Sequence, residues 1–128
     1  MRYLGIDFGT KRIGVALSDA HGSIAFPYSV VANTKTALTE IATIAKKEGV
    51  GLIVVGESKD FAGKQNVVME KITPFAQELE KQSGLPVIFE PEFMSSQQAS
   101  TFQGTHDKLD ASAAAIILQA YLERIKHR

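Results

Sequence analysis

The chain has 128 residues, the size of one ordinary domain, so we expect a single domain over residues 1–128. Its 14 basic and 14 acidic residues cancel, which excludes a global positive field that would attract nucleic acid from a distance. There is no cysteine, no signal peptide and no apolar run of the roughly 20 residues that a membrane helix needs, so we expect a cytoplasmic protein without disulfides or thiolate sites.

The first part of the chain is predicted to form three strands joined by tight turns. Apolar runs rich in Ile, Val and Leu predict strands over residues 2–6 and 12–18, with a glycine turn between them. A third strand is predicted over residues 23–31, after a polar turn that contains Gly22. Pro27 lies within this strand, and because proline has no backbone N–H, we expect the strand near an edge of the sheet. Short turns between consecutive strands favour an antiparallel meander.

The rest of the chain alternates between helical patterns and short strands. Apolar positions at helical spacing predict a helix over residues 36–48, which Gly49 closes. Pro74 indicates either a kink in the second helix or a later start. The other predicted elements are a strand over 52–55, a loop over 56–66, a helix over 68–83, a strand over 87–89, a short helix over 95–102 and a final helix over 110–125.

This order of elements predicts an α/β fold. Three antiparallel strands are followed by two strands that are reached through helical crossovers, which gives a mixed five-stranded sheet flanked by helices. In this order the first strand is expected at the centre of the sheet. The chain contains no internal repeat and no linker, so the whole of it is expected to contribute to one fold.

Three acidic residues lie at the ends of predicted elements, at places where they could meet. Asp7 ends the first strand, Glu92 lies just beyond the last strand, and Asp110 opens the final helix. Carboxylates that share a site repel one another unless a proton or a metal ion lies between them. Without cysteine the ligands would be oxygens, which favour Mg²⁺ or Mn²⁺, and such ions catalyse phosphoryl displacement.

Each acid also has a simpler interpretation. Asp7 could be an ordinary turn residue, and Asp110 could be a helix N-cap, with Asp107 as an alternative ligand. Glu92 could be a solvated surface residue, and Glu90 would point the same way from a strand.

A basic and hydroxyl-bearing turn follows Asp7. Thr10, Lys11 and Arg12 could contact phosphates beside the metal, or they could form a solvated hairpin turn. The loop over 56–66 lacks the spacing of a phosphate-binding P-loop.

Two long motifs resemble a known family. Residues 4–19, Leu-Gly-Ile-Asp-Phe-Gly-Thr-Lys-Arg-Ile-Gly-Val-Ala-Leu-Ser-Asp, resemble the N-terminal signature of the YqgF/RuvX family of the ribonuclease H-like superfamily, and residues 109–122 resemble its final helix. Members of that family are described as Holliday junction resolvases and as nucleases of pre-16S ribosomal RNA. The resemblance covers essentially the whole chain. It implies a ribonuclease H-like fold and a metal-dependent nuclease, with Asp7, Glu92 and Asp110 as the metal-binding acids.

One segment departs from the family pattern. Glu92 falls within the family's Asp-Glu-Arg motif, but Pro91 and Phe93 replace the Asp and the Arg, while the hydroxyl pair Ser95 and Ser96 is kept and is expected to contact nucleic acid. The lost arginine removes a forked phosphate donor.

Several functions therefore stay open. Maturation of the 5′ end of 16S ribosomal RNA is the leading interpretation. The alternatives are a Holliday junction resolvase, which requires a two-fold dimer, and a non-catalytic RNA- or ribosome-binding module. The segment Asp-Phe-Gly-Thr also resembles the phosphate loop of ATP-binding folds, but those need two such subdomains. We expect a monomer or a homodimer with nucleic acid as its partner.

Overall fold

A mixed sheet lies between helices on its two faces. The computed structural model describes residues 1–57, 69–91 and 106–126, and for Met69 and residues 106–110 it describes the backbone alone. Its elements are β1 (Arg2–Phe8), β2 (Arg12–Ser18), β3 (Ala25–Ala32), α1 (Ala37–Lys47), β4 (Val50–Glu57), α2 (Met69–Ser83), β5 (Val87–Pro91) and α4 (His106–Lys126). Within these ranges, no helix combines the length and the apolar character needed to cross a membrane.

The five strands follow the order β3-β2-β1-β4-β5, with β1 at the centre as the sequence predicts. β1 pairs antiparallel with β2, and β2 pairs antiparallel with β3. On its other side β1 pairs parallel with β4, and β4 pairs parallel with β5. The predicted mixed sheet is thus confirmed. β3 is an edge strand, and its pairing with β2 shifts register beside Pro27, as expected for a residue that cannot donate to the ladder.

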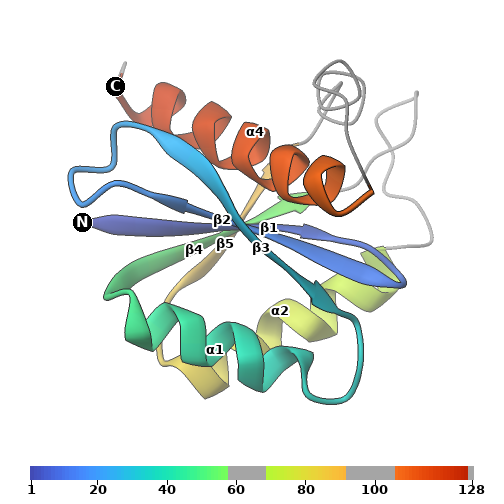
Figure 1. The fold of residues 1–128 in the computed structure, drawn as a ribbon. Helices are drawn as coiled ribbons and strands as arrows, with labels where there is room; N and C mark the ends of the chain where they lie inside the picture. The colour runs from blue at the N-terminus through green and yellow to red at the C-terminus, as the bar shows by residue number, and fades with distance from the viewer. Residues whose placement is uncertain (58–68, 92–105, 127–128) are drawn as a thin grey trace.

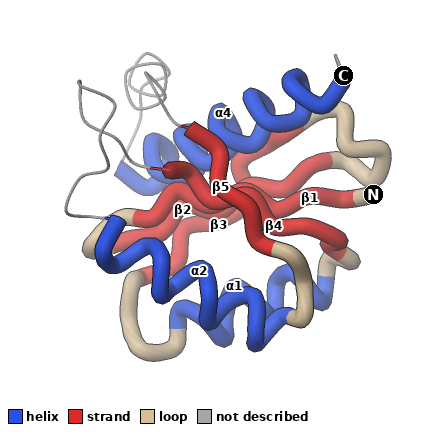
Figure 2. Tube along the Cα trace, turned by 180° about the vertical axis from the view of Figure 1, so that it is seen from behind, coloured by secondary structure: helices blue, strands red, loops and turns tan. Residues whose placement is uncertain are grey.

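The helices divide between the two faces of the sheet. α4 covers one face, and α1 and α2 cover the other (Figures 1 and 2). Along β1 the side chains alternate: Leu4 and Ile6 are fully buried in the core that also contains residues of α1 and α2. Tyr3 and Gly5 contact α4 instead. Asp7 continues that second series, so its side chain leaves the strand on the α4 face.

A glycine follows each of the helices α1 and α2 and caps its carboxyl end. Gly49 follows α1 with φ +68, and its N–H donates to the carbonyl of Lys46. Gly84 follows α2 with φ +71, and its N–H donates to the carbonyl of Glu80. Only glycine adopts this left-handed conformation without cost, so both predicted helix ends are confirmed.

Several predicted boundaries are wrong. β1 and β4 each extend by two residues at the carboxyl end, to Phe8 and Glu57, because pairing with neighbouring strands continues there. α2 begins at Met69 and includes Pro74, which excludes the later start. α4 begins at His106, so Asp110 does not open this helix and is not its N-cap. The short helix predicted over 95–102 lies outside the described residues.

Candidate active site at the carboxyl ends of the parallel strands

The register of the parallel strands brings three strand ends to one edge of the sheet. Ile6 pairs with Val55, and Gly56 pairs with Glu90, so Asp7, Gly56 and Glu90 lie at the same level. One strand, β4, separates β1 from β5, so their backbones are roughly 10 Å apart. Two acidic side chains and a metal ion can span such a distance. Glu92 itself follows β5 directly in sequence but lies outside the described residues.

Helix α4 runs antiparallel to β1 and contacts it closely. The ring centroids of Tyr3 and Tyr121 are 5.8 Å apart. Two residues further along β1, a Cβ on Gly5 would lie 2.7 Å from the Cβ of Leu118 and 3.0 Å from the carbonyl oxygen of Ala114. Glycine at this position therefore allows the helix to approach the strand. Movement along β1 towards its carboxyl end thus corresponds to movement along α4 towards its N-terminus.

The start of α4 consequently lies on the side of the molecule where β1 ends (Figure 1). From Gly5 to Asp7 the strand advances by roughly 6.6 Å, and from Ala114 back to Asp110 the helix extends by roughly 6 Å. Ala114 and Leu118 both face the sheet, and a step of four residues continues this face to position 110. The backbone of α4 includes both Asp107 and Asp110, whose side chains lie outside the described part of the chain.

Glu90 has a partner of its own. Its side chain is buried at 8% exposure and forms an ion pair with Arg124 of α4. A buried carboxylate requires such a partner, because its charge has lost the solvation that water provides. Glu90, the alternative to Glu92 on this strand, thus forms part of the contact between β5 and α4.

A tight turn borders Asp7. A Cβ on Gly9 would lie 2.4 Å from the carbonyl oxygen of Arg12, so only glycine fits between these backbone segments. Asn33, the residue that follows β3, secures the turn: its side-chain N–H donates to the carbonyl of Gly9 at 2.8 Å, and its backbone N–H donates to the carbonyl of Lys11 at 2.9 Å. Thr10 and Lys11 are exposed on this turn, and Arg12 is partly exposed. A hydroxyl and two cationic groups therefore lie at the rim beside Asp7.

Sequence reasoning missed three charged residues at this edge. Glu57 ends β4, between the ends of β1 and β5. Lys35 is exposed and lies two residues beyond Asn33, beside the turn, and Lys71 is exposed in the first turn of α2. The pairing of Arg12 with Ala32 could have indicated Lys35, because it places the residues before Arg12 beside those after Ala32.

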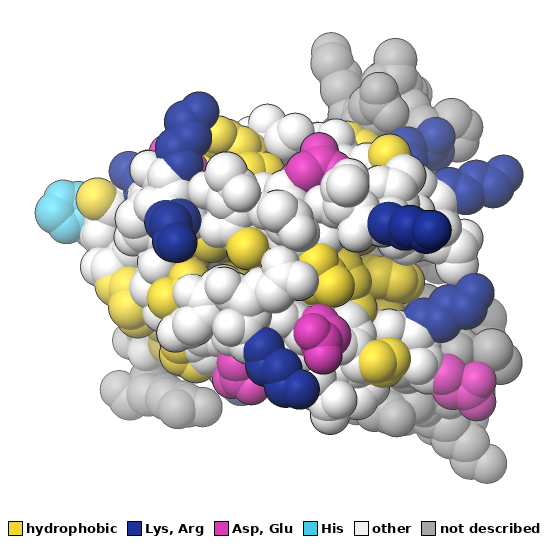
Figure 3. Space-filling model, turned by 90° about the horizontal axis from the view of Figure 1, so that it is seen from below, with side chains coloured by type: hydrophobic (Ala, Val, Ile, Leu, Met, Phe, Trp, Pro, Cys, Tyr) yellow, Lys and Arg dark blue, Asp and Glu magenta, His cyan; other side chains and the backbone are white. Residues whose placement is uncertain are grey.

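Basic side chains occur at this end of the molecule but are not confined to it. Seen from the side of α1 and α2, Lys and Arg side chains gather at the end where α2 begins and also appear at the opposite end (Figure 3). The distribution agrees with a net charge of zero. A polyanion would therefore be attracted by local groups of cations and not by the charge of the whole molecule, as the composition predicts.

The acids at this edge are oxygen donors, which suit Mg²⁺ or Mn²⁺. No group of three or more His, Cys, Asp or Glu side chains suited to a metal ion occurs among residues 1–57, 70–91 and 111–126. Those ranges include the side chain of Asp7 but exclude those of Glu92 and Asp110, as well as Ser95 and Ser96.

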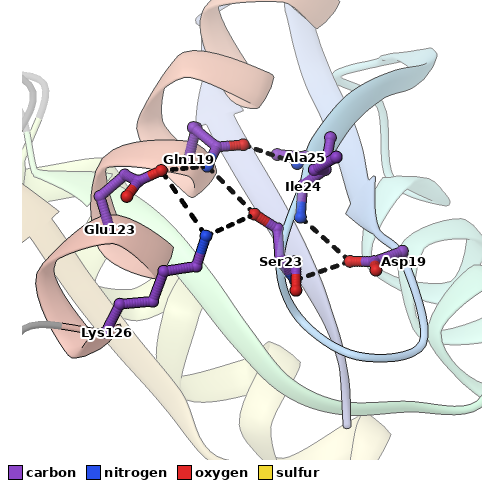
Figure 4. A network of polar contacts seen from close by, with 7 residues as sticks. All are labelled: Asp19, Ser23, Ile24, Ala25, Gln119, Glu123 and Lys126. Carbon is purple, nitrogen blue, oxygen red and sulfur yellow. Dashed lines mark hydrogen bonds and ion pairs between the residues drawn. The ribbon is translucent and has the colours of Figure 1, made fainter.

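The opposite end of the sheet carries a structural polar network (Figure 4). The Asp19 carboxylate accepts backbone N–H groups from Ile24 and Ser23, at 3.0 and 2.7 Å, and these bonds hold the pKa of Asp19 below its usual value. Gln119 of α4 accepts the N–H of Ala25 at 2.8 Å and donates to the carbonyl of Ser23 at 3.2 Å. These contacts attach the β2–β3 turn to α4.

Family and sequence comparisons concern nearly the whole chain. The family model described as "RuvX: Holliday junction resolvase" matches residues 1–124. The chain is 36% identical over 134 residues to a protein of Maridesulfovibrio salexigens named "Putative pre-16S rRNA nuclease", with 97% of this chain and 99% of the relative covered. A protein of the same name from Anaeromyxobacter sp. is 37% identical over 133 residues, covering 96% and 97%.

Solved structures resemble the fold. RuvC of T. thermophilus, in complex with a Holliday junction substrate, superposes with a TM-score of 0.65 at 15% identity, covering 98% of this chain and 96% of RuvC. Fowlpox virus resolvase, solved with its substrate Holliday junction DNA, gives 0.62 at 14% identity, covering 98% and 99%. At these identities the likeness concerns the fold alone, and it confirms the ribonuclease H-like architecture.

Proposed function

This chain belongs to the RuvX family of Holliday junction resolvases, and from this we propose that it is a metal-dependent nuclease that matures the 5′ end of pre-16S ribosomal RNA in the cytoplasm. The observation that carries the proposal is the position of Asp7. It is the last residue but one of the central strand, at the edge where β5 leads into Glu92, and its side chain leaves the strand on the face covered by α4, the helix that contains Asp110.

Asp7, Glu92 and Asp110 would hold the divalent ion. Mg²⁺ or Mn²⁺ at this position would activate water and stabilise the charge that develops on the phosphate. The contribution of the protein is to hold the carboxylates where repulsion between them is offset by the cation. Asp7 suits this role because its backbone is fixed by pairing with Gly14 in the centre of the sheet.

The nucleic-acid backbone would contact the turn beside Asp7. Thr10 offers a hydroxyl, and Lys11 and Arg12 offer cationic donors, which is the chemistry that phosphate oxygens require. Lys35 extends this basic rim, and Ser95 and Ser96 are proposed as further contacts. Asn33 supports the turn, so the donors of its exposed residues are held at a fixed place relative to Asp7.

The test is a cleavage assay on two substrates. Labelled pre-16S ribosomal RNA and a four-way DNA junction are incubated with the protein and Mg²⁺ or Mn²⁺ at 25 °C. We expect cleavage of the RNA, and we expect Asp7→Asn to lower its rate by at least about 100-fold, since the substitution removes a charged ligand. Asp19→Asn makes the same chemical change at the opposite end of the sheet and should keep the wild-type rate. If neither substrate is cleaved in a way that depends on Asp7, the proposal that the chain is a nuclease is refuted.

The same assay separates the alternatives. The family description favours DNA junctions as the second candidate substrate, and this activity would require a homodimer with paired sites. Cleavage of the junction by a dimer, without cleavage of the RNA, would support it. Salt-sensitive RNA binding that never leads to cleavage, and that persists in Asp7→Asn, would instead indicate a non-catalytic RNA- or ribosome-binding module.

A further inference from the structure

Two segments of the chain lie side by side at the edge where the central strand ends. They are the β1–β2 turn, residues 9–11, and the β3–α1 loop, residues 33–36 (Figure 1). Asn33 joins them, because its backbone N–H donates to the carbonyl of Lys11 and its side chain donates to the carbonyl of Gly9. Asn33 therefore lies opposite Lys11, and Lys35 follows two residues further along. Each segment thus brings one lysine to the same edge of the sheet.

Hydrogen bonds within the β3–α1 loop hold its backbone in place. The N–H of Thr34 donates to the carbonyl of Ala32 at 2.9 Å, and the N–H of Ala37 donates to the carbonyl of Thr34 at 3.1 Å. The N–H of Thr36 donates to the hydroxyl of Thr34 at 3.4 Å, and the two threonine hydroxyls are 3.1 Å apart. Lys35 lies between these threonines, so its backbone is fixed while its side chain is exposed.

Lys11 and Lys35 form no ion pair within residues 1–57, 70–91 and 111–126. The ion pairs in these ranges involve other cations, namely Arg2, Lys81, Arg124 and Lys126. Glu40, the acid in the first turn of α1, accepts the hydroxyl of Thr36 at 3.0 Å. Exposed ammonium groups that have no acid to leave are suited to contact the phosphate oxygens of a nucleic acid.

The spacing of the two lysines suits a single nucleic-acid strand. Cα atoms that face each other in an antiparallel pair are roughly 5 Å apart, and two further residues extend by at most roughly 7 Å. The backbones of Lys11 and Lys35 are therefore within roughly 12 Å of each other. A strand of a duplex carries one phosphate per roughly 3.4 Å of helix axis, so two cations at this separation can contact two phosphates of the same strand.

We infer that the β3–α1 loop belongs to the nucleic-acid-binding surface, and that Lys35 contacts a phosphate of the same strand that Lys11 contacts. This inference rests on the proposed function, since it assumes that nucleic acid binds at the edge beside Asp7. Both contacts are made to the backbone, so they position the strand without reading its sequence. Each phosphate neutralised on a single strand adds about −0.7 to the slope of log affinity against log salt, which is about fivefold in affinity at 0.1 M salt.

The experiment measures the binding of a short labelled single-stranded RNA to the full chain without divalent metal, so that no cleavage occurs. The parent protein and all variants carry Asp7→Asn, which also removes a carboxylate that repels phosphate. We expect Lys35→Gln to raise the dissociation constant about fivefold at 0.1 M salt and to make the slope between 50 and 200 mM shallower by about 0.7. Lys11→Gln should do the same, and the double variant should lose about 1.4.

Two further measurements test the chemistry of the contact. A second RNA of the same length but another sequence should show the same loss, because a phosphate contact is independent of the bases. Lys35→Arg keeps the charge and should bind within about twofold of the parent protein. Thermal unfolding shows that each variant is folded, as expected for substitutions of exposed side chains.

The control is Lys47→Gln, which makes the same chemical change at the other end of α1. Lys47 is exposed in the last turn of this helix, and the 11 residues of α1 separate it from the loop by roughly 16 Å. This variant should keep the slope of the parent protein. An unchanged slope in Lys35→Gln, or an equal loss in Lys47→Gln, would overturn the inference.

The outcome of this experiment is separate from that of the cleavage assay. If the RNA binds with the expected slopes but is never cut by the wild type, the nuclease fails and the inference stands. If cleavage depends on Asp7 while Lys35→Gln keeps its slope, only the inference fails. If the parent protein binds no RNA, both fail.

Discussion

At the scale of single residues, aspartates at the two ends of the sheet have different surroundings. Asp19 accepts backbone N–H groups and stabilises a turn, whereas Asp7 is the last residue but one of the central strand and lies beside a basic rim. Both residues lie at the carboxyl end of a strand and near a glycine, so the local sequence does not distinguish them. Their neighbours do: only Asp7 lies where the ends of three strands meet.

Asp19→Asn tests the structural role through pH. The pKa of Asp19 lies below its ordinary value of 3.8, because the backbone N–H groups of Ile24 and Ser23 stabilise the carboxylate. The resulting stability is present above pH 3.8 and is lost as the pH falls through the lower pKa of the folded state. We expect Asp19→Asn to melt at a lower temperature than wild type at neutral pH, with the difference shrinking in acid. Thermal melts across this range measure it, and a difference that grows as the pH falls would contradict this role.

The ion pair between Glu90 and Arg124 could not be predicted from the sequence. Glu90 and Arg124 are 34 positions apart, and neither belongs to a motif, so nothing in the sequence pairs them. Asp7 could be chosen as a candidate ligand because a strand pattern, a turn glycine and a family signature coincide there. Lys35 could have been inferred from the hairpin register, since the β2–β3 turn sets which residues face each other.

At the scale of elements, the strand order could be predicted but the boundaries could not. Apolar runs and turn glycines indicate where strands exist, and short connections determine which strands are antiparallel. The end of a strand, however, depends on its partner: β4 continues to Glu57 because β5 pairs with it there. The predicted start of α4 was wrong because Asp110 resembles an N-cap residue. Residues 106–109 contain no helix breaker, so the helix begins earlier, at His106.

Gly5→Ala tests the contact between β1 and α4. The added Cβ would lie 2.7 Å from the Cβ of Leu118 and 3.0 Å from the Ala114 carbonyl, so the helix must move away from the sheet. We expect a loss of about 1–3 kcal/mol in the free energy of unfolding, as is usual for overpacking. Cleavage should also slow, because Asp110 moves with the helix. Denaturant unfolding and the RNA assay measure the two effects.

Gly51→Ala is the matched control. Its Cβ would meet the side chain of Met1, which is flexible and can turn aside. This variant should therefore cost less stability than Gly5→Ala and leave cleavage unchanged. Equal losses for the two variants would mean that glycine is needed in these strands for a reason other than the approach of α4.

At the scale of the whole molecule, the fold brings the carboxyl ends of β1, β4 and β5 to one edge of the sheet. The central strand supplies Asp7, the outer parallel strand leads into Glu92, and the helix across the sheet contains Asp110. Family membership describes the kind of chemistry, and the register of β1, β4 and β5 supplies a physical reason why these acids could meet.

The central claim is that Asp7, Glu92 and Asp110 share a divalent ion. The most direct measurement is a crystal structure of the full chain grown with Mn²⁺, in which the anomalous scattering of manganese locates the ion. We predict a peak at the carboxyl end of β1, with oxygens of all three side chains at about 2.0–2.3 Å, the usual range for small divalent cations. A peak elsewhere, or an Asp7 carboxylate that faces no other acid, would contradict the account.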